Sequence, residues 1–315
     1  MSFIGPFSDV GIYIFFLVTG ISGNLFILTV HFLDWLKTFD FNPSILIINS
    51  ISLINIIFQG AITFDRITFF MFVMFYIKDS VVKPLVVILS SLAFSSLWSS
   101  TCLCFYYCIK IANFNGSFFY KVKAKAPVIV PWLLVISIAA SWSVGVSAYL
   151  DLYMDIKPVT VLTAGNITLI FSYSLRSRCK CIFHIYMLFA AFAFGIIFLT
   201  AGAIVTSLCK HMIRMKKNNE ASGNSRIHSH LSATKTVTSL LLLYLIFYGF
   251  LSSLFNEVEN AGNFIFLISY IVVSGFPTFN SIILIMGNRK LSDSLKKLLC
   301  MRPHAANTEV TVTTH

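Results

Sequence analysis

Long apolar runs separated by short polar stretches dominate the chain. A bilayer core of about 30 Å requires roughly 20 apolar residues per helix. The pattern therefore predicts seven membrane-spanning helices, at about 10–32, 44–64, 84–109, 127–149, 182–208, 236–255 and 262–286. The stretch 67–77 is also apolar, so the second helix either runs longer or ends in a hydrophobic loop. A β-barrel is not expected, because its strands would alternate over segments of about ten residues.

The composition places the chain in the same class. Of its 315 residues, 57% are hydrophobic and 11% are charged, whereas a soluble domain carries about 25% charged residues. We therefore expect an all-α membrane protein, with a seven-helix membrane domain at 1–302. A cleavable signal peptide is not expected, because the first nine residues contain no Lys or Arg.

The distribution of charge predicts the orientation. If the N-terminus is extracellular, 16 of the 23 Lys and Arg residues and five of the 12 Asp and Glu residues face the cytoplasm. The net charge of +11 then lies on the cytoplasmic face, as the positive-inside rule requires. This basic face is suited to anionic membrane lipids and to a cytoplasmic protein partner. The positive net charge is therefore explained without binding to nucleic acid.

Two N-x-S/T sequons test this orientation. Asn166 begins one in the outer loop between the fourth and fifth spans, and Asn115 begins another in an inner loop. Only an extracellular sequon meets the glycosylation machinery, so we expect a glycan on Asn166 alone.

The seven cysteines give weaker indications. No cysteine occurs in 80–90, at the outer end of the third helix, so that end has none to bond to the second outer loop. Whether Cys179 and Cys181 form a disulfide stays open. Residues 288–300 have an amphipathic pattern that predicts a short helix at the membrane surface. Cys300 ends this segment and is a candidate for palmitoylation. We expect the tail 303–315 to be disordered.

Three classes of seven-helix protein remain: a receptor, a transporter and a membrane-embedded enzyme. A transporter would show internal repeats and charges within its spans, and neither feature is evident. No HExxH or GxSxG motif is present. We therefore expect no catalytic residue, metal site or cofactor, and we favour a receptor.

Motifs along nearly the whole chain carry a more specific resemblance. They lie at the ends of the predicted first, third, fifth and seventh helices and at the start of the sixth. They read Gly23-Asn24-x-Phe26-Ile27, Trp98-x-x-Thr101-Cys102-Leu103, Tyr107-x-x-Lys110-Ile111, Ser207-Leu208-x-x-His211-x-x-x-Met215, His230-x-x-Ala233-Thr234-Lys235 and Leu284-Ile285-Met286-Gly287-Asn288. In this order and spacing they resemble the type 2 taste receptor family, the bitter taste receptors, which are G-protein-coupled receptors.

Some positions depart from the family pattern. Many members have Asn-His where this chain has Ala93-Phe94, and a frequent Trp is replaced by Leu89. The seventh helix has Asn280-Ser281 in place of His-Ser. The resemblance thus implies a less polar ligand pocket, suited to bulky apolar or weakly basic agonists. Vomeronasal type 1 receptors remain the alternative, and a multi-pass transporter is a more distant one.

The resemblance implies a plasma-membrane receptor that binds bitter small molecules on its extracellular side. The expected pocket lies between the third, fifth, sixth and seventh helices. Its candidate lining residues are Leu89, Ala93, Phe94, His184, Met187, Tyr244, Phe247, Tyr248, Phe266 and Tyr270. Asp65 and Arg66 stand at its mouth, where they either bind charged ligands or anchor the end of the second helix.

The resemblance also implies a heterotrimeric G-protein partner, gustducin or a related inhibitory-class protein. The candidate coupling and switch residues lie at the inner ends of the third, fifth and sixth helices. They are Tyr107, Lys110, His211, His230, Leu231 and Lys235. Agonist identity, tissue and a homo- or hetero-dimeric state stay open.

Overall fold

The computed structural model describes residues 6–39, 42–111, 117–163, 166–179, 181–217, 224–256 and 264–300. Within these ranges the chain forms long helices and one β-hairpin. The elements are α1 (Pro6–Thr38), α2 (Pro43–Met71), α3 (Val73–Tyr76), α4 (Asp79–Ile111), α5 (Ser117–Asp151), β1 (Leu152–Thr163), β2 (Asn166–Ser177), α6 (Cys181–Lys217), α7 (Asn224–Asn256), α8 (Phe264–Gly287) and α9 (Arg289–Cys300).

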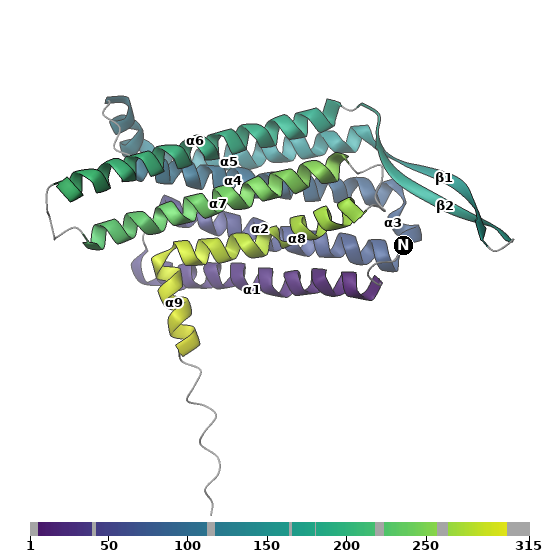
Figure 1. The fold of residues 1–315 in the computed structure, drawn as a ribbon, viewed down its shortest axis with the longest axis horizontal. Coiled ribbons are helices and arrows are strands. Elements are labelled where there is room, and N and C mark those ends of the chain that lie inside the picture. The colour runs from purple at the N-terminus through teal and green to yellow at the C-terminus, as the bar shows by residue number, and fades with distance from the viewer. Residues whose placement is uncertain are drawn as a thin grey trace, which may run out of the picture.

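Seven of the described helices, α1, α2, α4, α5, α6, α7 and α8, are long and apolar enough to cross a membrane. They lie side by side in one bundle (Figure 1). The expected seven-helix membrane protein is therefore confirmed. The open question at 67–77 is also answered: α2 continues to Met71, and the short helix α3 follows it.

The β-hairpin is an element that the apolar runs did not predict. Strands β1 and β2 pair antiparallel along their full length, from Leu152 opposite Ser177 to Thr163 opposite Asn166. The hairpin projects beyond the bundle at the end where the described N-terminus lies, and α9 leaves from the opposite end (Figure 1). Asn166 thus belongs to the extracellular end of the molecule, the side on which a glycan is expected.

Helix α4 occupies the centre of the bundle, where it contacts α2, α5, α6 and α7. Small residues allow the close approach. A Cβ added to Gly145 of α5 would lie 3.2 Å from the Cα of Ser91 in α4, so a larger residue would force these helices apart. Ser95 and Ser99 are fully buried on the same helix. Membrane helices associate through such small residues, because lipid offers no hydrophobic gain for helix pairing.

A chain of buried polar side chains connects four helices in the interior. Asn24 of α1 donates to the carbonyl oxygens of Gly20 (2.8 Å) and of Pro277 in α8 (3.3 Å). Asn55 of α2 donates to Asn24 Oδ1 at 3.4 Å, and Ser96 of α4 donates to Asn55 Oδ1 at 2.8 Å. These side chains stabilise one relative arrangement of α1, α2, α4 and α8.

Helix α9 begins with a side-chain cap, since Asn288 Oδ1 accepts from the backbone N–H of Lys290 at 3.0 Å. Leu291 is fully buried, whereas Leu298 and Leu299 are exposed. Lys290 forms an ion pair with Asp34 of α1. The predicted amphipathic helix is therefore present, and it is tied to the inner end of α1. The tail 303–315 lies outside the described residues.

Candidate functional site

The outer halves of α4 and α6 meet in an aromatic cluster. The ring of Phe94 lies 5.2 Å from that of Tyr186 and 5.5 Å from that of Phe189, both in edge-to-face geometry. Trp98, one turn further along α4, lies 5.0 Å from Phe189. Such edge-to-face pairs contribute about 0.5–1.5 kcal/mol beyond the area they bury.

A second aromatic cluster joins α7 to α8. Phe247 packs against Phe276 with ring centres 4.1 Å apart and the rings tilted by 32°, and Tyr244 lies 5.4 Å from the same ring. All three side chains are buried. The cluster therefore packs α7 firmly against α8 at mid-bundle.

Polar groups converge beneath these rings. The hydroxyl of Tyr244 faces Ser100 of α4 and Asn280 of α8. Its geometry nevertheless falls short of a hydrogen bond, and neither amide atom of Asn280 is bonded to the described part of the chain. An unsatisfied buried polar group costs free energy. A change of conformation that brings the Tyr244 hydroxyl and the Asn280 amide into hydrogen bonds would therefore be favourable.

The extracellular end of the bundle contains a buried ionic network. Asp65 Oδ2 accepts from Arg66 Nη2 at 2.6 Å and from the Tyr270 hydroxyl at 2.5 Å. The Tyr76 hydroxyl donates to Asp65 Oδ1 at 3.0 Å. Arg66 also lies over the ring of Tyr270, 3.7 Å from its centre. Asp65 thus connects α2, α3 and α8.

Burial and the neighbouring Asp65 carboxylate both raise the pKa of Tyr76. Its hydroxyl therefore keeps its proton at neutral pH and remains a donor. Asp65 is 2% exposed and Arg66 is 6% exposed. Of the two roles considered for this pair, the geometry favours the anchor, because the carboxylate is already satisfied by protein donors.

The predicted pocket residues lie in the extracellular halves of α4, α6, α7 and α8. Ala93, Phe94, Tyr244, Phe247, Phe266 and Tyr270 are buried, and Leu89, Met187 and Tyr248 are half-buried. Tyr248 stacks on Phe194 of α6 at 6.2 Å.

His184 differs from the other predicted pocket residues. Its side chain is exposed, and it lies about 200° around α6 from the buried Tyr186, at 100° per residue. The structure therefore does not bring His184 to the aromatic cluster. Sequence reasoning also missed Tyr186, Phe189 and Phe276. The spacing of three between Tyr186 and Phe189 places both on one side of a helix and was available in the sequence.

The predicted coupling residues lie at the cytoplasmic ends of their helices. Tyr107 is half-buried against the core, and Lys110 and Lys235 are exposed. The Nζ atom of Lys123 in α5 donates to the carbonyl oxygen of Lys110 at 3.4 Å. The backbones of His211, His230 and Leu231 are helical, and their side chains lie outside the described part of the structure.

The described cysteines and possible metal ligands do not extend the candidate site. Cys179 takes part in a disulfide, whereas Cys102, Cys104, Cys108 and Cys300 are free thiols. Within the described ranges, no three His, Cys, Asp or Glu side chains gather as a metal site would require.

Comparison with known proteins gives a consistent result. Residues 7–303 match the sequence profile of the Taste receptor protein (TAS2R) family. Human Taste receptor type 2 member 2 is 25% identical over 288 residues, which cover 90% of this chain and 93% of that protein. Taste receptor type 2 member 9 of Pongo pygmaeus is 28% identical over 285 residues, or 90% of each chain. Human Taste receptor type 2 member 39 is 26% identical over 289 residues, which cover 89% of this chain and 82% of that protein.

The family profile spans all seven membrane-spanning segments and the whole of α9. The relatives are receptors rather than enzymes. The chain therefore belongs to the TAS2R family of bitter taste receptors, and it is a multi-pass G-protein-coupled receptor of the plasma membrane.

Proposed function

We propose that the protein binds bitter small molecules between the outer halves of α4, α6, α7 and α8 and then activates a gustducin-type, inhibitory-class G protein. Family membership over residues 7–303 is the observation that carries this proposal. The ligand contacts are Leu89, Ala93, Phe94, Met187, Tyr244, Phe247, Tyr248, Phe266 and Tyr270.

The chemistry of these residues supports apolar and weakly basic agonists. Ligand pockets are mostly apolar, with a few placed polar groups. Here the aromatic rings of Phe94 and Phe247 provide the apolar surface, and the hydroxyl of Tyr244 provides a buried polar group. The nearby charges of Asp65 and Arg66 already neutralise each other, so they offer little attraction to a strongly charged ligand.

Activation requires that the agonist bind the active arrangement more tightly than the resting one. In this structure, the inner ends of α7 and α8 lie very close. A Cβ added to Gly287 of α8 would lie 2.7 Å from the Cβ of Thr236 in α7. An agonist that disturbs the contact between Phe247 and Phe276 would loosen α7 from α8. The inner end of α7 would then swing outward and expose the cytoplasmic face to the G protein.

The cytoplasmic face is suited to an acidic partner. Lys110, Lys123, Lys125 and Lys235 are all exposed there, and complementary charge accelerates association. The switch role of His211 and His230 stays a proposal, in which hydrogen bonds between α6 and α7 hold the resting state.

Calcium imaging tests both parts of the proposal. Cells would express the receptor with a gustducin-tailed Gα and receive a broad panel of bitter compounds, with surface staining as the expression control. We expect a dose-dependent response that requires both proteins. Phe94→Ala and Phe247→Ala should raise the half-maximal agonist concentration several-fold, as the loss of one aromatic contact implies. Phe198→Ala, at a side chain 60% exposed on α6, should not.

Coupling can be separated from ligand binding by charge reversal. Lys235→Glu should lower the maximal response, because it opposes an acidic partner on the cytoplasmic face. Lys78→Glu, at an exposed extracellular lysine, is the matched control. Silence of the wild-type receptor at good surface expression would contradict the bitter-agonist assignment. Equal loss in both lysine variants would contradict the coupling face.

A further inference from the structure

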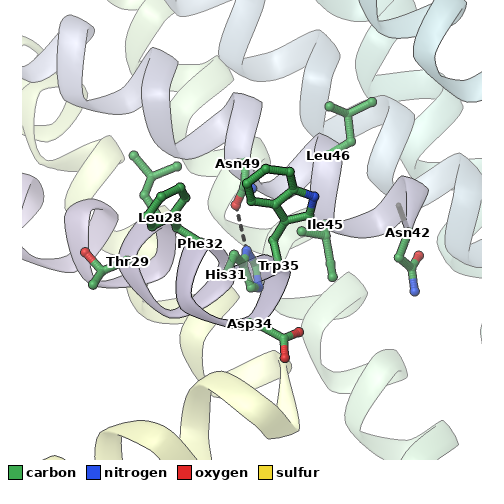
Figure 2. Close-up of a pocket in the computed structure, with 10 residues that line it drawn as sticks. All are labelled: Leu28, Thr29, His31, Phe32, Asp34, Trp35, Asn42, Ile45, Leu46 and Asn49. Atoms are coloured by element: carbon green, nitrogen blue, oxygen red, sulfur yellow. Dashed lines mark hydrogen bonds between the residues drawn. The ribbon is translucent and has the colours of Figure 1, made fainter. Parts of the chain in front are cut away.

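A groove of about 590 Å³ lies between the cytoplasmic ends of α1 and α2, far from the proposed agonist site. We call it the α1–α2 groove. Its walls include Leu28, Phe32 and Trp35 of α1 and Leu46 of α2, and His31 and Asn49 also line it. Figure 2 shows these side chains around one hollow, with His31 and Asn49 joined by a hydrogen bond.

The groove opens toward the lipid. Phe32 is 57% exposed and Trp35 is 38% exposed, and both belong to the membrane-spanning segment Val10–Lys37. His31 lies six residues before Lys37, and Asn49 lies six residues after Pro43. At 1.5 Å per residue, both are about 9 Å inside the cytoplasmic ends of their spans. The groove therefore lies at the depth of the cytoplasmic leaflet.

A hydrogen-bonded polar pair lies in the groove, in which His31 is 2% exposed and Asn49 is half-buried. His31 Nδ1 donates to Asn49 Oδ1 at 2.6 Å. In the neutral ring, His31 Nε2 then keeps a lone pair, and the Asn49 amide keeps its N–H groups. A hydroxyl group is both a donor and an acceptor, so a single hydroxyl complements both residues.

The charges argue against an anionic headgroup. Apart from His31, Asp34 is the only acidic or basic residue among the ten that line the groove, and it forms an ion pair with Lys290 of α9. A phosphate would meet this carboxylate and find no lining Lys or Arg. The groove is therefore suited to an uncharged lipid.

We propose that the α1–α2 groove binds a membrane sterol, with its hydroxyl on His31 and Asn49 and its rigid rings against Phe32 and Trp35. A sterol combines one hydroxyl with a flat apolar body, which matches the His31–Asn49 pair and the aromatic wall. The bound sterol would join α1 to α2 beside the attachment of α9. This site is independent of the proposed agonist site.

Photolabelling tests the proposal in the full-length receptor. The receptor would be reconstituted in phospholipid nanodiscs with a photoreactive sterol, and the labelled peptides would be identified by mass spectrometry. We expect labelling to concentrate in residues 28–49 and to be competed by unlabelled sterol. The 3α-hydroxy epimer should compete about fivefold less well, the effect of losing about 1 kcal/mol of hydrogen bonding. A comparable groove of about 540 Å³ between α7 and α8, lined by Leu245, Phe250 and Ile265, is the internal reference.

Two variants separate the contribution of the polar pair to sterol binding from that of the aromatic wall. Asn49→Leu removes the amide and should lower labelling about fivefold. Because this change also leaves His31 without its partner, Phe32→Ala provides a second test that does not alter the polar pair. Phe64→Ala is its matched control, since Phe32 and Phe64 are each 57% exposed. We expect Phe32→Ala to reduce labelling and Phe64→Ala to leave it unchanged.

Three results would overturn the proposal. Equal labelling of the α1–α2 groove and of the reference groove would indicate general lipid contact. Equal competition by the two epimers would show that the sterol hydroxyl does not contribute to binding. Stronger competition by an anionic phospholipid than by the sterol would show that the site prefers a charged headgroup. None of these results depends on agonist response or on G-protein coupling.

Discussion

Removing the carboxylate of Asp65 should destabilise the receptor more than any ordinary polar substitution in the bundle. Asp65→Ala would leave the guanidinium of Arg66 buried, with 6% of the residue exposed, and without its acidic partner 2.6 Å away. It would also remove the acceptor for Tyr76 and Tyr270. A charge left alone in a buried site costs about 3–5 kcal/mol.

The size of the effect distinguishes this mechanism from simpler ones. Hydrogen bonds between membrane helices average about 0.6 kcal/mol, and exposed ion pairs contribute about 1 kcal/mol or less. For proteins of 150–250 residues, 1 kcal/mol shifts the melting temperature by about 2–4 °C. This chain is longer, with 315 residues, so we take about 2 °C per kcal/mol and expect Asp65→Ala to lower the melting temperature by about 6–10 °C. Asp34→Asn, at the half-exposed pair with Lys290, should lower it by about 2 °C at most.

The assay is thermal unfolding of the detergent-solubilised receptor, followed by tryptophan fluorescence or thiol labelling. The double variant Asp65→Leu/Arg66→Met should recover most of the loss, because it removes both charges together. If Asp65→Ala melts no lower than Asp34→Asn, the anchor interpretation is wrong. An unchanged melting temperature with a large loss of agonist potency would instead support direct ligand contact by Asp65.

Three further predictions address other parts of the molecule. Gly287→Ala should raise agonist-independent signalling in the calcium assay, because its Cβ would press on Thr236 and separate the inner ends of α7 and α8; unchanged basal signalling at equal surface level would contradict this. Asn166→Gln should abolish a glycosidase-sensitive mobility shift on gels, and Asn115→Gln should not; a glycan on Asn115 would reverse the assigned orientation. Asn55→Leu should cost about 1–2 kcal/mol in thermal unfolding, since it removes the links to α1 and α4; an equal or higher melting temperature would show that the polar chain is unimportant.

The seven helices were predictable because the bilayer imposes a length that soluble folds do not. Runs of about 20 apolar residues leave few alternatives, and charge asymmetry then gives the orientation. The amphipathic helix at 288–300 was predictable for a similar reason. Its leucines and lysines follow helical spacing, and Leu291 is indeed buried, whereas Lys296 is exposed.

The hairpin was not predictable in the same way. The residues of β1 and β2 include apolar runs such as Leu169 to Phe171, which do not alternate strictly with polar residues. Their pairing depends on contacts between two separate segments, with Leu152 opposite Ser177 and Thr163 opposite Asn166. The sequence pattern predicted only an outer loop between the fourth and fifth spans.

For the candidate site, the sequence predicts which residues share one face of a helix, but it does not predict which faces of different helices meet. The contact between Asp65 and Tyr270 joins residues 205 positions apart, and no local pattern indicates it. His184 shows the same limit within one helix, since it lies near the extracellular end of α6 with an exposed side chain, about 200° around the helix from Tyr186. One residue turns a helix by 100°, so a correct depth does not ensure a correct direction.

Nucleotide exchange with purified components tests the central claim most directly. The receptor in nanodiscs would be mixed with a gustducin-type heterotrimer and a bitter agonist from the cellular screen, and exchange on Gα would be followed. The account predicts agonist-dependent exchange that Phe247→Ala weakens at low agonist and Lys235→Glu weakens at all agonist concentrations. Agonist-dependent exchange that is unchanged in both variants, or no exchange with a well-folded receptor, would contradict it.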